Sequence, residues 1–394
     1  MLFFNPIFFL NYRFLFLFSF AFLIIGDPPS SSDYIEPEEN RRSIIYNTTY
    51  GFIDGENWVV PSRVWVHKER RWMQRLVSRL LNLTSDYSSD QIDILHKRLR
   101  DIAANSRSRR TVTIRFINDP EERSFRIENR IGEHPRTDRN GIITGNLKIP
   151  KDVAEELLDA QDSNKGWLTA EVTSGRYLGN GRIRLLEPEG LSVVSDIDDT
   201  IKITEIPAGA RVVVRNTFFK EYAAAPIMNE LYENWENASF HYVSGSPWQL
   251  YRSLANFLIG ESGFPEGSFH MKNARKNPLT ISTWSDLTEF VTNELLTFEQ
   301  KISQISELFE NFPGRKFILV GDSGERDPEV YREIENNYPD QVKEIIIRDV
   351  VNAREKNPDR LEGMTILPAP TVYRLNERVA EIEELLEAGE DVYE

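Results

Sequence analysis

The chain has no cysteine and only five histidines among its 394 residues. The absence of cysteine excludes disulfide bonds, zinc–thiolate sites and cysteine nucleophiles. The small number of histidines leaves little room for histidine-based metal sites or catalytic triads. The formal net charge of −15 argues against general binding of nucleic acid. A phosphate-binding site would therefore have to be made positive locally, by a cation or by backbone N–H groups that point at it.

Long apolar runs are also scarce. The longest, Phe14–Ile25, follows Arg13 and is shorter than the span of about 20 residues that a membrane helix needs. It fits the core of a signal peptide better, and the patch Phe8–Leu10 could extend it into a signal anchor. We therefore expect residues 1–26 to be a signal peptide or signal anchor, and the protein to be in the secretory pathway, membrane-anchored or secreted. If the segment is not used, a cytoplasmic, membrane-associated protein is expected instead.

The remaining composition is typical of a globular protein, with 40% hydrophobic and 28% charged residues. The length allows two or three domains. Residues 27–45 are rich in Pro, Ser and Glu and are predicted to be a linker. Residues 371–394 contain eight acidic and two basic residues, which predicts an acidic C-terminal helix or tail.

Residues 46–188 are predicted to form a β-rich N-terminal domain with a helical insertion. Short alternating or β-branched runs, separated by Gly, Pro and Asn–Gly, are typical of a small antiparallel barrel or, as we expect here, of a small β-sandwich-like domain. These runs are Trp58–Val60, Val64–His67, Thr111–Ile117, Ser124–Ile127, Gly141–Ile149, Gly166–Thr173 and Arg182–Leu185. Apolar residues at helical spacing predict the insertion, at Trp72, Leu76 and Leu80 and again at Ile92, Leu95 and Leu99.

A basic stretch lies within this region. Residues Arg63–Arg110 include twelve Lys or Arg and five Asp or Glu, inside an otherwise acidic chain. This charge indicates either a solvated helical face or a surface that meets anionic lipid headgroups.

The pattern changes after Glu189, where apolar strands alternate with helical stretches. The predicted strands are Leu191–Ser195, Phe240–Val243, Lys316–Val320 and Lys343–Arg348. This alternation predicts an α/β domain over residues 189–370, with a parallel sheet flanked by helices. Ligands of such sheets bind outside the carboxyl ends of the strands.

Each predicted strand is followed by polar residues. The first is followed by Asp196, Asp198 and Asp199, three carboxylates within four residues. At a separation of about 4 Å, each like-charge pair costs roughly 4 kcal/mol at an effective dielectric constant near 20. The second strand is followed by Ser244–Gly245. The third strand is followed by the segment GDSGERD, which contains Asp322 and Asp327. Lys301 lies in a helical stretch before the third strand.

If these strands are adjacent and parallel, the carboxylates, a hydroxyl group and an ammonium group converge on one edge of the sheet. Clustered carboxylates repel one another unless a divalent cation binds among them, and hard oxygen ligands suit Mg²⁺. One aspartate could attack phosphorus, and a second could protonate the leaving oxygen and then activate water. The hydroxyl group, backbone N–H groups and the lysine would hold the phosphoryl oxygens.

The segment DIDDT resembles the DxDxT nucleophile motif of the haloacid dehalogenase superfamily, and Ser244, Lys301 and the pair Asp322 and Asp327 follow in the order of its other motifs. SDIDDTIK, FHYVSGSPWQLY, GFPEGSFHMK and FILVGDSGERDPEVY resemble the catalytic domain of the fungal actin-patch type of Mg²⁺-dependent phosphatidate phosphatase, over roughly Leu191–Pro370. The segment TDRNGIITGNLKIP is similar to the domain that precedes it in that family. The resemblance implies a haloacid-dehalogenase-like fold. It also implies hydrolysis of phosphatidate to diacylglycerol and phosphate through an aspartyl-phosphate intermediate.

The resemblance also implies the roles of individual residues. Asp196 would be the nucleophile and Asp198 the general acid/base, with the Asp198 backbone carbonyl facing Mg²⁺. The implied site residues are catalytic Asp196, Asp198 and Lys301, substrate-binding Thr200, Ser244 and Gly245, and the metal ligands Asp196, Asp198, Asp322 and Asp327. The implied cofactor is Mg²⁺, and the implied partner is a phospholipid at a membrane surface. Asp199 lies between the motif positions and is expected to have a structural role.

Two other interpretations share the same fold. The protein could be a phosphatase for soluble phosphoesters, or a non-catalytic scaffold. The scaffold is disfavoured because every expected catalytic position is filled. No protein partner is predicted from the sequence.

Overall fold

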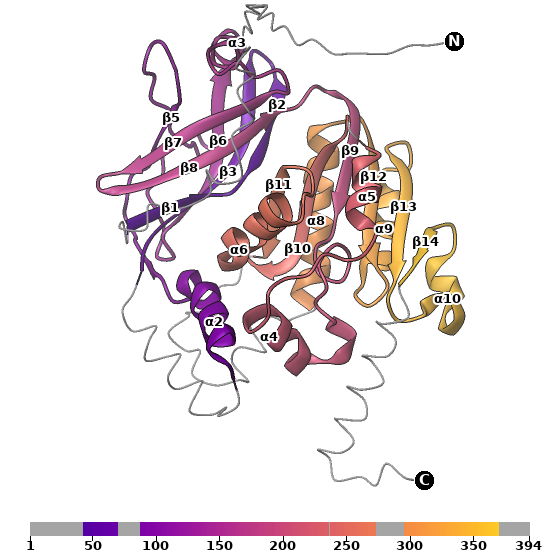
Figure 1. Ribbon diagram of the computed structural model, residues 1–394. Helices are drawn as coiled ribbons and strands as arrows, with labels where there is room; N and C mark the ends of the chain where they lie inside the picture. The colour runs from indigo at the N-terminus through magenta and orange to yellow at the C-terminus, as the bar shows by residue number, and fades with distance from the viewer. Residues whose placement is uncertain (1–41, 70–86, 236, 273–294, 370–394) are drawn as a thin grey trace, which may run out of the picture.

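The computed structural model describes residues 42–69, 87–235, 237–272 and 295–369 (Figure 1). Within these residues the strands form two sheets, one of eight strands in the first part of the chain and one of six strands in the second. The predicted linker 27–45 lies outside them except for its last residues, where the first strand begins at Arg42. The predicted acidic segment 371–394 also lies outside the described residues.

The first sheet is mostly antiparallel. Its strands are β1 (Arg42–Tyr46), β2 (Thr49–Asp54), β3 (Asn57–Lys68), β4 (Asn105–Ser106), β5 (Thr113–Phe116), β6 (Ile142–Pro150), β7 (Trp167–Ser174) and β8 (Tyr177–Leu185). Because β1 pairs with both β3 and β8, and β2 also joins β3 to β8, the sheet curls back on itself. The hydrogen bonds thus form one continuous sheet, and the expected sandwich of two sheets is not confirmed.

Strand β3 shows where the sequence interpretation was incomplete. Two separate strands were expected on either side of Pro61, but β3 runs through it, and β6 pairs with it along its length. Strands β1 and β2 were not predicted. Helix α3 (Lys151–Ala160) buries Ala154 and Leu157 in the same core.

Helix α2 (Ser89–Ile102) is the described part of the predicted helical insertion, since Trp72, Leu76 and Leu80 lie outside the described residues. It begins with a capping box, in which Ser88 and Gln91 bond each other's backbone N–H groups. Its buried residues Leu95, Leu99 and Ile102 belong to the core of the second sheet. The insertion therefore attaches the first part of the chain to the second.

The described residues of the basic stretch are partly engaged in internal contacts. The guanidinium groups of Arg63, Arg98 and Arg110 lie over the rings of Trp248, Tyr222 and Tyr177, at 5.1, 3.4 and 5.4 Å from the ring centres. Cation–π contacts of this kind fix the side chains against the protein. For these three arginines the structure favours internal packing over a fully solvated face.

The second sheet is parallel throughout. Its strands are β9 (Glu189–Ser195), β10 (Ser239–Pro247), β11 (Gly267–Lys272), β12 (Gly314–Asp322), β13 (Val342–Asp349) and β14 (Thr365–Pro368), in the order β11-β10-β9-β12-β13-β14. Successive side chains of β9 point to opposite faces. Val193 packs in the core that contains α4 (Ala210–Phe218), α5 (Met228–Glu233) and α6 (Tyr251–Ala255), and Val194 in the core that contains α8 (Leu295–Asn311) and α9 (Asp327–Asn337). The predicted parallel sheet flanked by helices is confirmed.

The strand order positions the site. Strand β9 comes first in the chain but lies in the middle of the sheet, with β10 on one side and β12 on the other. The chain adds β10 and β11 on one side of β9 and then returns to add β12, β13 and β14 on the other. The point at which the strand order reverses is between β9 and β12, and in open α/β sheets ligands bind at the carboxyl ends of the strands at this point.

The first sheet covers one edge of the second. The backbone N–H of Phe269 in β11 donates to the carbonyl of Thr48 at 3.0 Å, and the Thr48 N–H donates to the hydroxyl group of Tyr251 at 2.9 Å. Tyr50 in β2 packs against His270 and accepts a hydrogen bond from Asn311 at 2.9 Å. A covered edge strand cannot pair with another chain.

The expected secretory location is corrected. Residues 1–26, on which it rested, lie outside the described residues. Among the helices that the structure does describe, none is both long and apolar enough to cross a membrane. The prediction rested on the apolar run Phe14–Ile25 alone and is withdrawn.

Burial of His270 at this contact predicts sensitivity to acid. Burial lowers the pKa of His270 from 6.5 to about 4, so below pH 6.5 the unfolded chain binds a proton that the folded chain does not. Stability is therefore lost as the pH falls from 6.5 towards 4. Between pH 7.5 and pH 5, the unfolding free energy of the wild type should fall by about 2 kcal/mol more than that of His270→Gln, because the variant lacks this titrating group. Urea unfolding at the two pH values measures this, with the exposed His134→Gln as control; an equal loss in His270→Gln and wild type would contradict the prediction.

Candidate functional site

Four carboxylates meet at the carboxyl ends of β9 and β12. Asp196 follows β9, Asp322 ends β12, Glu325 lies in the turn after β12, and Asp327 is the first residue of α9. Carboxylate oxygens of these four residues all lie within 4.8 Å of one another. Asp196, Asp322 and Asp327 are buried and Glu325 is partly exposed. The expected convergence of residues from separate strands is therefore observed.

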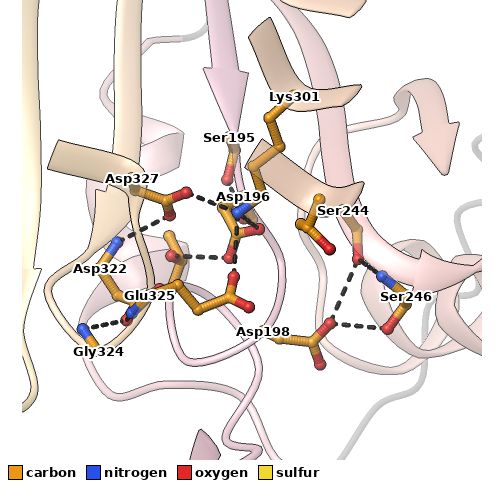
Figure 2. Close-up of polar contacts among 12 residues, drawn as sticks. Ser195, Asp196, Asp198, Ser244, Ser246, Lys301, Asp322, Gly324, Glu325 and Asp327 are labelled. Atoms are coloured by element: carbon orange, nitrogen blue, oxygen red, sulfur yellow. Dashed lines mark hydrogen bonds and ion pairs between the residues drawn. The ribbon is translucent and has the colours of Figure 1, made fainter. Parts of the chain in front are cut away.

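Lys301 on α8 links this carboxylate cluster. Its Nζ lies 2.8 Å from Asp196 Oδ1, 3.0 Å from Glu325 Oε2 and 2.6 Å from Asp327 Oδ1. Figure 2 shows the side chain of Lys301 extending towards Asp196 and Asp327. Burial alone would lower the pKa of Lys301, but the carboxylates of Asp196, Asp327 and Glu325 raise it well above its usual value. The ammonium group is therefore permanently charged.

The loop after β12 is shaped by two glycines. A Cβ atom on Gly321 would lie 2.5 Å from Asp327 Oδ2, and one on Gly324 would lie 2.7 Å from a side-chain atom of Pro207. Asp322 Oδ1 accepts the N–H groups of Gly324 and Glu325 at 2.6 and 3.1 Å. The Asp322 N–H donates to Asp327 Oδ2 at 3.2 Å. Side chains at either glycine would force the acidic residues of GDSGERD apart.

Hydrogen bonds orient Asp196. Thr200 Oγ1 donates to Asp196 Oδ2 at 3.1 Å, and Ser195 Oγ donates to the Asp196 carbonyl at 2.5 Å. Tyr232 donates in turn to Ser195 Oγ at 2.6 Å. Thr200 thus holds the side chain of Asp196 in place, and its implied role in substrate binding stays a prediction.

Asp199 has a structural position. Its φ of 58° is left-handed, and its carboxylate accepts the N–H groups of Thr204, Glu205 and Ile206 at 2.8, 2.7 and 2.5 Å. The buried Arg348 of β13 donates to the Asp199 carbonyl at 2.7 Å. Asp199 therefore closes the loop, and its carboxylate is not in the group that could hold a metal ion.

Asp198 lies apart from the cluster, beside Ser244 and Ser246 (Figure 2). Its Oδ1 contacts Lys202 Nζ at 2.6 Å and Thr204 Oγ1 at 2.7 Å, and its Oδ2 accepts from Ser246 Oγ at 2.8 Å and Ser244 Oγ at 3.3 Å. Burial alone would raise the pKa of Asp198, but Lys202 and the hydrogen bonds lower it to about 2. The side chain of Asp198 is therefore not among the carboxylates that could hold a metal together, whereas that of Glu325, which was not predicted, is. The predicted metal contact of Asp198 through its backbone carbonyl stays a prediction.

The substrate-binding residues expected after β10 lie on the Asp198 side. Ser244 is fully buried, and its Oγ accepts the Ser246 N–H at 3.0 Å. A Cβ atom on Gly245 would lie 2.7 Å from Thr297 Cγ2 of α8, so only glycine lets the backbone at this position lie so close to α8.

Sequence analysis missed Lys202 and Ser246, because their role depends on contact with Asp198 across the loop. Glu325 could have been found from its place in GDSGERD.

The acidic cluster fits a divalent cation. Asp322 is completely buried, and its Oδ2 has no hydrogen-bond partner among the described residues. Burial raises the pKa of Asp322 well above its usual value, and Asp327, Glu325 and Asp196 raise it further. A buried carboxylate oxygen with no partner is costly, and an oxygen-only donor set is what hard cations bind. The residues that could hold a metal ion are Asp196, Asp322, Glu325 and Asp327.

Comparison with known proteins agrees with the expected resemblance. Residues 191–349 match the family described as "Phosphatidate phosphatase APP1, catalytic domain". The chain is 31% identical over 182 residues to "Phosphatidate phosphatase APP1" of Saccharomyces cerevisiae, a match that covers 45% of this chain and 29% of that protein. It is 28% identical over 179 residues to "Uncharacterized protein C29B5.04c" of Schizosaccharomyces pombe, covering 43% and 27%. The resemblance is thus confirmed for this segment, and the matches span less than a third of either relative's length.

Repulsion within the cluster predicts a response to metal. We expect Mg²⁺ to raise the unfolding temperature of the wild type by several degrees, because a bound ion stabilises the folded state by mass action. Asp322→Asn removes one buried charge and keeps an oxygen for the Gly324 N–H. This variant should unfold at a higher temperature than the wild type without metal and should show little response to Mg²⁺.

The control is Asp340→Asn, which changes an exposed aspartate. It should respond to Mg²⁺ as the wild type does. A full Mg²⁺ response in Asp322→Asn, measured by thermal unfolding, would show that the cluster is not the metal site.

Proposed function

We propose that the protein is a Mg²⁺-dependent phosphatidate phosphatase, which hydrolyses phosphatidate to diacylglycerol and phosphate. The observation that carries the proposal is the position of Asp196, held by Thr200 and Lys301 beside three further carboxylates. The match of residues 191–349 to a phosphatidate phosphatase catalytic domain supports the lipid substrate. The strand order and the sequence of the site residues support a haloacid-dehalogenase-like fold for residues 189–370, preceded by a separate β-rich domain over 46–188.

In the first half of the reaction, the Asp196 carboxylate attacks phosphorus and the bond to the diacylglycerol oxygen breaks, which leaves an aspartyl-phosphate. A divalent cation held by the acidic cluster would neutralise carboxylates that otherwise repel the phosphate. Lys301 keeps the carboxylates of Asp196 and Asp327 in place. The hydroxyl group of Ser244 and the N–H of Gly245 are assigned to the phosphoryl oxygens.

Asp198 is assigned to proton transfer. In the second half of the reaction it takes a proton from the water that attacks the aspartyl-phosphate, and phosphate is released. Its contacts with Lys202, Thr204 and Ser246 keep it ionised, which is the form a base requires. In the first half, Asp198 gives the diacylglycerol oxygen the proton that it kept from water in the preceding turnover, so the proton is returned in each cycle. The negative charge of the bound phosphoryl group favours the protonated form of Asp198 against the effect of Lys202.

The first test is loss of activity. Asp196→Asn should abolish phosphate release from phosphatidate in detergent micelles, because an amide is not a nucleophile. Asp198→Asn should lower kcat by about 10²- to 10⁴-fold, the usual contribution of general acid–base catalysis, and removal of divalent metal should also abolish activity. Glu333→Gln, on an exposed position of α9, is the control. Full activity in either aspartate variant would reject the mechanism.

The second test concerns the substrate. We expect kcat/KM for phosphatidate to exceed that for soluble sugar phosphates by at least a hundredfold, measured as phosphate release across a substrate panel. Comparable values would reject the lipid assignment and would favour a phosphatase for soluble phosphoesters. Absence of release from every phosphomonoester, with metal present, would favour a non-catalytic scaffold.

A further inference from the structure

Given the proposed phosphatase function, we infer that Lys272 is a second ammonium group that binds the phosphoryl oxygens of the substrate. Lys272 is the last residue of β11 and of the segment GFPEGSFHMK, and the motifs gave it no role. Three features of its surroundings support this role.

The first feature is that Lys301 has used its hydrogen-bonding capacity. A lysine ammonium group has three N–H donors. Lys301 has three carboxylate partners, Asp196, Glu325 and Asp327, at 2.8, 3.0 and 2.6 Å. In this arrangement Lys301 balances the charge of the acidic cluster and has no N–H left for the substrate. The charge of the phosphoryl group must then be met by other donors.

The second feature is the position of Lys272 at the same edge of the sheet. In the pairing of β10 with β11, Ser244 lies opposite Met271, and Lys272 pairs with Pro247 after a shift of register, so Lys272 adjoins the last residues of β10, which include Ser244. Its Nζ donates to Thr297 Oγ1 at 3.2 Å. Thr297 Cγ2 in turn lies 2.7 Å from where a Cβ atom of Gly245 would be. Thr297 also precedes Lys301 by one turn of α8, so α8 brings the two lysines to the same site.

The third feature is the electrostatic environment. Lys272 is only 5% exposed, and burial of an ammonium group is costly unless an anion compensates for it. Burial lowers the pKa of Lys272 and Glu325 raises it, so Lys272 interacts with the same carboxylate that contacts Lys301. A phosphoryl group bound at Ser244 and Gly245 would supply further negative charge beside Lys272 through a charge-assisted hydrogen bond.

These donors match the charge of the reacting group. In phosphoryl transfer the negative charge is spread over three equatorial oxygens. The Ser244 hydroxyl group, which turns from its 3.3 Å contact with Asp198, the Gly245 N–H and the Lys272 ammonium group provide one donor for each oxygen, while Lys301 stabilises the attacking carboxylate.

The test compares Lys272→Met with Lys316→Met in the full chain with Mg²⁺. Lys316 is the matched control, because it lies in the same sheet but is exposed near the start of β12. We expect Lys272→Met to weaken binding of inorganic phosphate, measured by calorimetry, by about ten- to a hundredfold, the usual effect of losing a hydrogen bond to a charged group. Its KM for phosphatidate should rise by a similar factor, and its response to Mg²⁺ in thermal unfolding should stay as in the wild type. Lys316→Met should match the wild type throughout.

Unchanged phosphate affinity in Lys272→Met would overturn the inference. If this variant does not fold, Lys272→Arg and Lys272→Gln replace it. The arginine variant should bind phosphate more tightly than the glutamine variant, and equal affinities would overturn the inference. If the wild type releases no phosphate from phosphatidate, the proposed function fails, but binding of inorganic phosphate still tests Lys272 by itself.

Discussion

The contact of Lys301 with three carboxylates is the interaction on which the site depends. Asp196 follows β9, whereas Glu325 and Asp327 follow β12, and these acidic residues would repel one another without a cation between them. The ammonium group compensates for part of this charge. Among the described residues the Oδ2 atom of Asp322 has no hydrogen-bond partner, which fits a further cation at this site. The fold meets this requirement by placing α8 against the reversal point of the sheet, so that Lys301 reaches both strand ends.

The same physical reasoning separates two aspartates that lie two residues apart. Asp196 faces Lys301 and the acidic cluster, whereas Asp198 faces Lys202, Ser244 and Ser246. Burial and the neighbouring carboxylates raise the pKa of Asp196 despite Lys301, while Lys202 helps to hold that of Asp198 at about 2. The two carboxyl groups therefore lie in different electrostatic environments, Asp196 among acidic neighbours with one lysine and Asp198 beside a lysine and hydroxyl groups. The loop that separates them is held by Asp199, which accepts three backbone N–H groups, and by Arg348, which donates to the Asp199 carbonyl.

Much of the second sheet could be predicted, because its central strands are short apolar runs followed by polar residues. Its outer strands β11 and β14 were missed, since GSFHMK and TILP are short and mixed in polarity. The first sheet was predicted less well. β3 passes through Pro61, which reads as a strand end in sequence, yet pairing with β6 on one side and β1 and β2 on the other keeps it extended. Local patterns cannot show such pairing, because the partner strands are far away in the chain.

By itself, the sequence determined which residue types follow each strand of the second sheet, since Asp196, Ser244 and Asp322 stand at fixed positions after apolar runs. It also determined that a metal at this site would bind through oxygen, because the chain has no cysteine and few histidines. Only the tertiary structure showed which carboxylates come close enough to hold a metal ion together. It brought Glu325 into this group and turned the side chain of Asp198 towards Lys202, whose Nζ lies 2.6 Å from Asp198 Oδ1. That choice depends on distances between side chains from separate elements, which no local pattern in a sequence contains.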